Sequence, residues 1–118
     1  MGDLLTGRYA ALTQGLVDAV LTTRGHTPSD LRRAVLARAR SLAARGRALA
    51  DGVPVPFAGY LDKVALHAYK VGDDDVAALQ RAGNSDDAVF EVTVAAALGA
   101  ALGRLDRGLA ALRGEEPD

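Results

Sequence analysis

Residues 85–112, SDDAVFEVTVAAALGAALGRLDRGLAAL, decide the fold. The stretch opens with Ser85, a good N-cap, and two aspartates follow where the positive end of a helix dipole favours negative charge. The rest is rich in alanine, the residue with the highest helix propensity, and contains no proline. One long helix is therefore predicted, from Ser85 to about Leu112. Large residues at helical spacing predict its apolar stripe: Phe90, Val94, Leu98, Leu105, Leu109 and Leu112.

Four shorter helices are predicted before this one, because apolar residues recur there at helical spacing. The expected ranges are about Asp3–Thr22, Thr27–Ala50, Phe57–Lys70 and Asp73–Gly83. Gly25 suits the left-handed position after the first helix, while Thr27 suits the N-cap of the second and Pro28 its first turn. The second helix is expected to bury Leu31, Val35, Leu42 and Leu49. The third is expected to bury Phe57, Tyr60, Leu61, Val64 and Ala68.

The fold class predicted is thus all-α, a compact bundle of about five helices. A chain of 118 residues has the size of one domain, 1–118, with residues 113–118 expected to form an acidic, frayed tail. No long apolar run follows a basic stretch near the N-terminus, so no signal peptide is expected. The longest apolar run, Val92–Leu102, is too short to span a bilayer. These patterns favour a cytoplasmic protein without a membrane partner.

Composition excludes several kinds of chemistry. The chain has no cysteine, which rules out disulfides, thiolate catalysis and cysteine-ligated metals. Its net charge is −1, so no bulk attraction for nucleic acid is expected. Asp73–Asp75 lacks the alternating spacing of a calcium loop and is interpreted as a helix start. No metal or cofactor is predicted. Arginines on the outer face of the second helix indicate a solvated face or an oligomer rim with salt bridges: Arg33, Arg40 and Arg47.

Small residues form a ridge on the long helix, at Ala95, Gly99 and Gly103. Each interior glycine costs about 1 kcal/mol relative to alanine, which suggests that close packing repays it. The ridge predicts a close helix crossing, either within the chain or between subunits.

Glu91 lies at nearly the same helical angle as the leucines of the long helix. A carboxylate on that side needs a partner, or else it takes up a proton. Two interpretations follow: a structural salt bridge to an arginine or a histidine, or a proton-transfer group with a raised pKa.

His67 lies at the edge of the third helix's apolar face, on the same side as Tyr60 and Lys63. A neutral imidazole there could accept a proton, although an edge histidine is more often structural. The candidate catalytic residues are therefore His67, Glu91, Tyr60 and Lys63.

The segment from Val76 to Leu112 resembles the carboxymuconolactone decarboxylase and alkylhydroperoxidase D-like family. The resemblance rests on a helix ending in Ala-Gly, a Ser-Asp-Asp cap, and Val-Phe-Glu before an alanine-rich helix, and it extends back to about Pro28. It implies an alkylhydroperoxidase D-like bundle and a homo-oligomer joined through helix faces.

Redox members of that family carry Cys-x-x-Cys, a histidine shortly after it and a glutamate upstream. The histidine falls on His67, the two cysteines on Tyr60 and Lys63, and the glutamate near Ala48. Only the histidine is kept, and without sulfur the chain is not a thiol peroxidase.

Two functions follow from these patterns. The first is an alkylhydroperoxidase D-like protein that is inactive or uses acid–base groups on a small organic acid or lactone. The alternative is a non-enzymatic module, either an oligomeric scaffold or a protein that binds a small apolar or organic-acid ligand.

Overall fold

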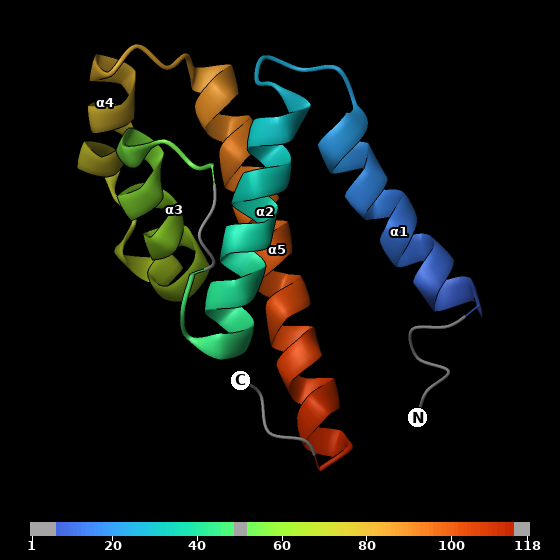
Figure 1. Cartoon of the computed structure of the whole chain (residues 1–118). Coiled ribbons are helices and arrows are strands. Elements are labelled where there is room, and N and C mark those ends of the chain that lie inside the picture. Colours follow the sequence, from blue (N-terminus) through green and yellow to red (C-terminus); the bar gives the residue numbers. More distant parts are fainter. Residues whose placement is uncertain (1–6, 49–51, 115–118) are drawn as a thin grey trace.

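A computed structural model of the chain describes residues 7–48 and 52–114. Within these ranges the chain is all-helical, as predicted, and five α-helices form a bundle (Figure 1). The α-helices are α1 (Gly7–Thr22), α2 (Ser29–Arg45), α3 (Val55–His67), α4 (Asp73–Arg81) and α5 (Asp86–Leu112), and a short 3-10 turn, η2 (Ala68–Lys70), follows α3.

The centre of the bundle is the pair α2 and α5, which run side by side (Figure 1). Helix α1 lies on one side of this pair, and α3 and α4 lie on the other. Most of the core lies between α2, α3 and α5 and includes Val35, Leu61 and Val92, which are almost completely buried. A smaller cluster joins α1 to the pair through Leu21, Leu36 and Leu102.

The contact between α2 and α5 is made by backbone, not by large side chains. A Cβ atom built on Gly99 would lie 2.3 Å from the carbonyl oxygen of Leu36, and one on Gly103 would lie 2.3 Å from that of Arg40. In each case a glycine hydrogen points at the oxygen, which is the arrangement of a weak Cα–H···O bond. The small-residue ridge is therefore an intrachain helix crossing.

The predicted stripe on α5 holds only in part: Leu109 is buried and Leu98 is partly buried, as predicted. The buried face is mostly small: it includes Ala95, Ala96, Gly99 and Ala100. Phe90 is 67% exposed, and Leu105 and Leu112 are exposed as well. The prediction was wrong for these three because it ranked positions by side-chain size, whereas α2 approaches too closely for large side chains.

Several helix boundaries differ from the expected ones. Helix α2 begins at Ser29 with Pro28, and not Thr27, at its N-cap, and α3 ends at His67 and not at Lys70. Helix α2 ends at Arg45 and not near Ala50, because Gly46 takes the left-handed conformation and its N–H donates to the Leu42 carbonyl. Leu49, expected on the buried face, lies outside the described residues. Helix α3 begins at Val55, two residues early, since Pro56 fits its first turn.

Of two further expectations for the middle helices, one was wrong and one was correct. Ala68, expected in the core face of α3, is exposed in the 3-10 turn, and Ala65 is buried in its place. The aspartates do start α4 as predicted: an oxygen of Asp75 accepts a hydrogen bond from the Gly72 N–H at 2.9 Å. Ser85 likewise caps α5 by accepting from the Ala88 N–H at 3.1 Å.

Among the described residues, α5 is the one helix with the length and composition of a bilayer-crossing segment, with a mean hydropathy of 1.6 over its most apolar window. In that window 44% of the residues are buried inside the chain. The apolar run noted in the sequence, Val92–Leu102, is the middle part of this helix.

Substituting Gly99 tests the backbone contact. We expect Gly99→Ala to lower the free energy of unfolding by roughly 1–3 kcal/mol, because the new methyl group would overlap the Leu36 carbonyl and force α2 and α5 apart. The measurement is chemical denaturation followed by circular dichroism.

Gly108→Ala is the matched control in the same helix. Nothing lies within 4 Å of a Cβ built there, so alanine should raise the free energy of unfolding by about 0.5–1 kcal/mol. Equal stabilisation by both substitutions would contradict the backbone contact.

Candidate functional site

Glu91, in the second turn of α5, holds the connection between α1 and α2. Its carboxylate accepts hydrogen bonds from the backbone N–H groups of His26 and Thr27 at 2.7 and 2.8 Å. It also accepts from the Thr27 hydroxyl at 2.6 Å and lies 3.2 Å from Nδ1 of His26. The side chain is 19% exposed. Glu91 therefore joins the connection that precedes the second helix to the start of the fifth.

Arg32, in the first turn of α2, lies beside the Glu91 carboxylate. Its guanidinium lies 3.5 Å from the Glu91 carboxylate and donates to the backbone carbonyls of four residues: Val20, Leu21, Thr23 and Thr27. The first three carbonyls lie at the C-terminal end of α1, where a helix lacks internal donors and carries partial negative charge. Arg32, although only 5% exposed, is thus fully partnered and caps α1.

The pKa of Glu91 is lowered from an ordinary 4.5 to about 2. Burial by itself raises the pKa of this carboxyl, but the donors from His26 and Thr27 stabilise the charged form by more. The raised pKa required for a proton-transfer group is therefore not found. The geometry fits the other interpretation, a structural carboxylate partnered by a histidine and an arginine.

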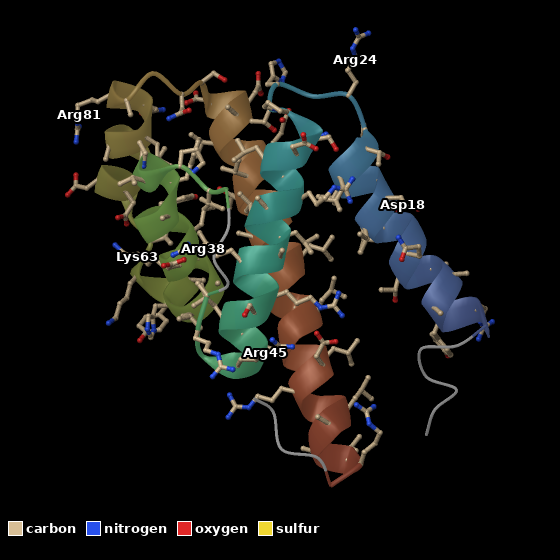
Figure 2. All side chains as sticks on the ribbon, viewed as in Figure 1. Asp18, Arg24, Arg38, Arg45, Lys63 and Arg81 are labelled. Carbon is tan, nitrogen blue, oxygen red and sulfur yellow. The ribbon has the colours of Figure 1, made fainter. Side chains whose placement is uncertain are left out.

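Gly25 leaves room for the Glu91 carboxylate beside the connection between α1 and α2, a role that was not expected from the sequence. A Cβ atom on Gly25 would lie 2.6–2.8 Å from the Glu91 carboxylate. Its backbone is not left-handed, so the expected role after the first helix was wrong. A depression of about 180 Å³ lies beside the cluster, lined by residues that include Val20, Phe90 and Glu91. Arg24, in the same connection, extends outward (Figure 2).

Tyr60 lies at the junction of two larger depressions between α3, α4 and α5. One, of about 520 Å³, lies between α3 and α4. The other, of about 450 Å³, lies between α4 and α5 and includes Phe90 and Thr93. The Tyr60 hydroxyl is 2.7 Å from that of Thr93. Because Tyr60 belongs to both linings, we call the two depressions together the Tyr60 cleft.

The hydrogens of the two hydroxyls can be assigned from their partners. The Thr93 hydroxyl donates to the Val89 carbonyl at 2.7 Å, and a carbonyl oxygen can only accept. Thr93 has one hydroxyl hydrogen, so Tyr60 must donate to Thr93. The Tyr60 oxygen is then left with acceptor capacity alone.

The charged groups of the Tyr60 cleft are mainly acidic. Lys63 lines it but is held by Asp75 at 2.8 Å, which lowers the pKa of that carboxyl. Asp74 and Asp86 add two further carboxylates. Figure 2 shows Lys63 on the α3 side of the molecule. The lining therefore offers more acceptors than donors.

The four sequence-predicted site residues do not surround one cleft. Tyr60 and Lys63 line the Tyr60 cleft, whereas Glu91 lines the separate depression beside α1. His67, the last residue of α3, is exposed and packs edge-on against the Tyr69 ring, with ring centroids 6.0 Å apart. His67 is in the lining of neither depression.

Two arginines of α2 form ion pairs within the chain. Arg38 pairs with Asp62 of α3 through contacts of 2.6 and 2.8 Å, and Arg40 pairs in the same way with Asp106 of α5. The second pair raises the pKa of the Arg40 guanidinium. Of the three arginines expected on the outer face of this helix, Arg33 and Arg47 are exposed, whereas Arg40 is engaged by Asp106 within the chain.

Sequence reasoning missed Arg32, Thr27 and Thr93 as partners of the candidate residues. For Arg32 a signal was available: it lies one helical turn before Val35 and Leu36, both buried, so its charge had to find partners inside the bundle. The roles of Thr27 and Thr93 depend on contacts between distant segments, which the spacing of residues along the chain does not reveal.

No family model matches this chain, and comparisons with curated proteins and with solved structures found no match either. The alkylhydroperoxidase D-like resemblance therefore stays a prediction from the sequence.

Replacing the Glu91 carboxylate should make stability depend less on pH. A folded-state pKa near 2, below the ordinary 4.5, means that the carboxylate stabilises the fold fully above pH 4.5. This contribution is lost as the pH falls from about 4.5 towards 2. We expect Glu91→Gln to lower the free energy of unfolding by about 2 kcal/mol at pH 7, and the gap from the unsubstituted chain to close on acidification.

Asp87→Asn is the control, because Asp87 also faces His26, at 3.6 Å, but is 72% exposed. It should cost about 0.5 kcal/mol or less. A gap for Glu91→Gln that stays constant between pH 7 and pH 2.5 would show that the carboxylate has no such role. Urea denaturation at a series of pH values provides the measurement.

Proposed function

We propose that this chain is a non-enzymatic binding module that holds a small organic molecule in the Tyr60 cleft. The observation that carries the proposal is the Tyr60–Thr93 hydroxyl pair at the junction of two depressions of about 520 and 450 Å³. Depressions of this volume fall within the range of small-molecule sites. Apolar contacts are available from Leu79, Val89 and Phe90.

The polar groups of the cleft favour a ligand that donates hydrogen bonds. The Tyr60 oxygen has acceptor capacity alone, Lys63 is engaged by Asp75, and the other charged lining residues are carboxylates. An amine with an apolar body satisfies these acceptors. An organic acid, one of the ligand classes expected from the sequence, would face the negative charges of Asp74 and Asp86, and like charges that approach closely repel. The proposal is therefore an amine-binding cleft.

The acid–base enzyme has less support. It needs His67 and Glu91 at one cleft, but Glu91 is consumed by the connection between α1 and α2, with a pKa of about 2. A carboxylate of that pKa is a poor proton acceptor near neutral pH. Descent from the alkylhydroperoxidase D-like family is compatible with the proposal, since Tyr60 and Lys63 stand where that family's cysteines are expected.

A matched pair of probes tests ligand class and location together. We expect 2-phenylethylamine to shift the backbone amide NMR signals of Tyr60, Leu79 and Thr93, and 3-phenylpropionate, its acidic counterpart, to leave them unchanged. Shifts confined to residues outside the Tyr60 cleft, or equal binding of the acid, would contradict the proposal.

Thr93→Val tests the assignment of the hydroxyl hydrogens. Without Thr93 as acceptor, the Tyr60 hydroxyl has a free hydrogen to present to the ligand, and one acceptor oxygen is lost. The affinity for the amine should fall about tenfold, the effect of one hydrogen bond of about 1.4 kcal/mol. Thr13→Val, the same change on α1, is the control and should leave the affinity unchanged.

A further inference from the structure

An ion pair forms part of the wall of the Tyr60 cleft. The ammonium of Lys63 on α3 (Figure 2) lies 2.8 Å from Oδ1 of Asp75, in the first turn of α4, and both residues line the depression of about 520 Å³. The Lys63 side chain is 35% exposed and that of Asp75 is 23% exposed. Because both side chains reach solvent, neither charge needs the other to be tolerated in this position. The cleft thus already holds a primary ammonium group against a carboxylate.

Asp75 keeps its position without help from Lys63. Its Oδ2 atom accepts a hydrogen bond from the Gly72 N–H at 2.9 Å, which caps the start of α4. The other oxygen, Oδ1, is the atom that accepts from Lys63. Since the backbone fixes one oxygen, the second is presented to the cleft in one orientation, and a preorganised acceptor of this kind binds an ammonium group at little entropic cost.

Lys63, in contrast, can move away from Asp75. Its ammonium lies at the end of a flexible stem of four carbons, and its contact with Asp75 is the one that the described residues provide. Asp74 lines the same depression, and within residues 7–48 and 52–114 no hydrogen bond or ion pair is found for its side chain. Lys63 can therefore exchange Asp75 for Asp74 and leave neither charge in the depression without a partner.

A glycine inside α3 leaves space beside this ion pair. Gly59 lies one helical turn before Lys63 and lines the same depression, and nothing lies within 4 Å of a Cβ atom built on it. Glycine inside a helix is destabilising relative to alanine, and no packing contact requires it here. Tyr60 and Leu79 border this space. It can take the apolar body of a ligand whose amine reaches Asp75.

We propose that Asp75 is the carboxylate that binds the amine ligand of the Tyr60 cleft, and that Lys63 occupies this carboxylate until a primary amine displaces it. The inference rests on the proposed function, because it names the group that recognises an amine there. A primary alkylammonium has the same charge and the same three N–H donors as the lysine side chain, so it can form the contact that Lys63 now makes. A quaternary ammonium has no N–H donor and cannot replace it. The ligand class is therefore narrowed to primary amines with an apolar body.

Lys63→Met removes the internal competitor and keeps an unbranched side chain. We expect it to raise the affinity for 2-phenylethylamine about threefold to fivefold, because the ligand no longer has to displace a partly exposed ion pair. Lys70→Met is the matched control and should leave the affinity unchanged, since Lys70 is the other lysine of the chain and lines neither depression. NMR titration provides the measurement.

The outcomes of this titration separate the inference from the proposed function. If 2-phenylethylamine shifts the Tyr60 and Thr93 signals but Lys63→Met leaves its affinity unchanged or lowers it, the inference is overturned and the amine-binding cleft stands. Binding by the Lys63→Met chain alone supports the inference, since Lys63 then blocks the site. Binding by neither chain contradicts both.

Two further comparisons test the role of Asp75. Asp75→Asn removes the charge but keeps an oxygen for the Gly72 N–H, so the start of α4 is preserved, and the affinity for 2-phenylethylamine should fall about tenfold. Asp73→Asn, in the same turn but in neither lining, should change the affinity little. The quaternary analogue trimethyl(2-phenylethyl)ammonium should not compete with the primary amine. Equal binding of the two compounds, or full affinity in Asp75→Asn, would overturn the assignment.

The Nζ signals of the two lysines report the displacement itself. Saturation with 2-phenylethylamine should shift the ¹⁵N signal of the Lys63 ammonium and leave that of Lys70 in place, because Lys63 alone changes its partner. A Lys63 signal that stays unchanged at saturation would show that the ligand binds without displacing the lysine, and the inference would be wrong.

Discussion

The fold depends on two glycine hydrogens that face two backbone carbonyls. Gly99 and Gly103 lie four residues apart on α5, and the carbonyls they face, those of Leu36 and Arg40, lie four residues apart on α2. Two matching rows of this kind bring the helices into backbone contact along a whole turn. The close approach leaves room for alanine but not for leucine on that face of α5. It therefore decides which side chains fill the core and which are turned outward.

The outward side chains are a consequence of this choice. The face of α5 that packs against α2 consists of small residues, so several of its larger residues lie on other faces. Phe90 lies beside the Tyr60 cleft, and Leu105 and Leu112 lie toward the end of the helix. The Tyr60 cleft uses the flank that carries Phe90. The ion pairs from Arg38 to α3 and from Arg40 to α5 add contacts between α2 and two of its neighbours.

A charged cluster fixes the other end of the bundle. Glu91 binds the backbone of the connection between α1 and α2, and Arg32 binds the last carbonyls of α1. Neither group is left without a partner, which is the condition under which buried charges are tolerated. The same completeness argues against catalysis by Glu91, since its lone pairs and its charge are already used. The Tyr60 oxygen, by contrast, can still accept a hydrogen bond from a ligand.

The number and approximate positions of the helices could be predicted from the sequence, since capping groups such as the Ser85 and Asp75 side chains act within a few residues of the chain. The buried face of α5 could not be predicted, because the spacing of large apolar residues does not show how closely two helices approach each other. Glu91 was correctly placed toward the interior, but its partners His26 and Thr27 lie more than sixty residues away in the sequence. Only the folded arrangement shows that these partners lower its pKa and that His67 lies elsewhere.

The most direct test of this account is a nuclear Overhauser spectrum of the chain with labelled alanine methyl groups. If α2 and α5 meet through their small faces, strong cross-peaks should join the Gly99 Hα protons to the Ala39 methyl group and the Gly103 Hα protons to that of Ala43. A Cβ on each glycine would lie 3.1 and 2.8 Å from those methyl carbons. Absence of both cross-peaks, with Leu105 and Phe90 contacting α2 instead, would contradict the account.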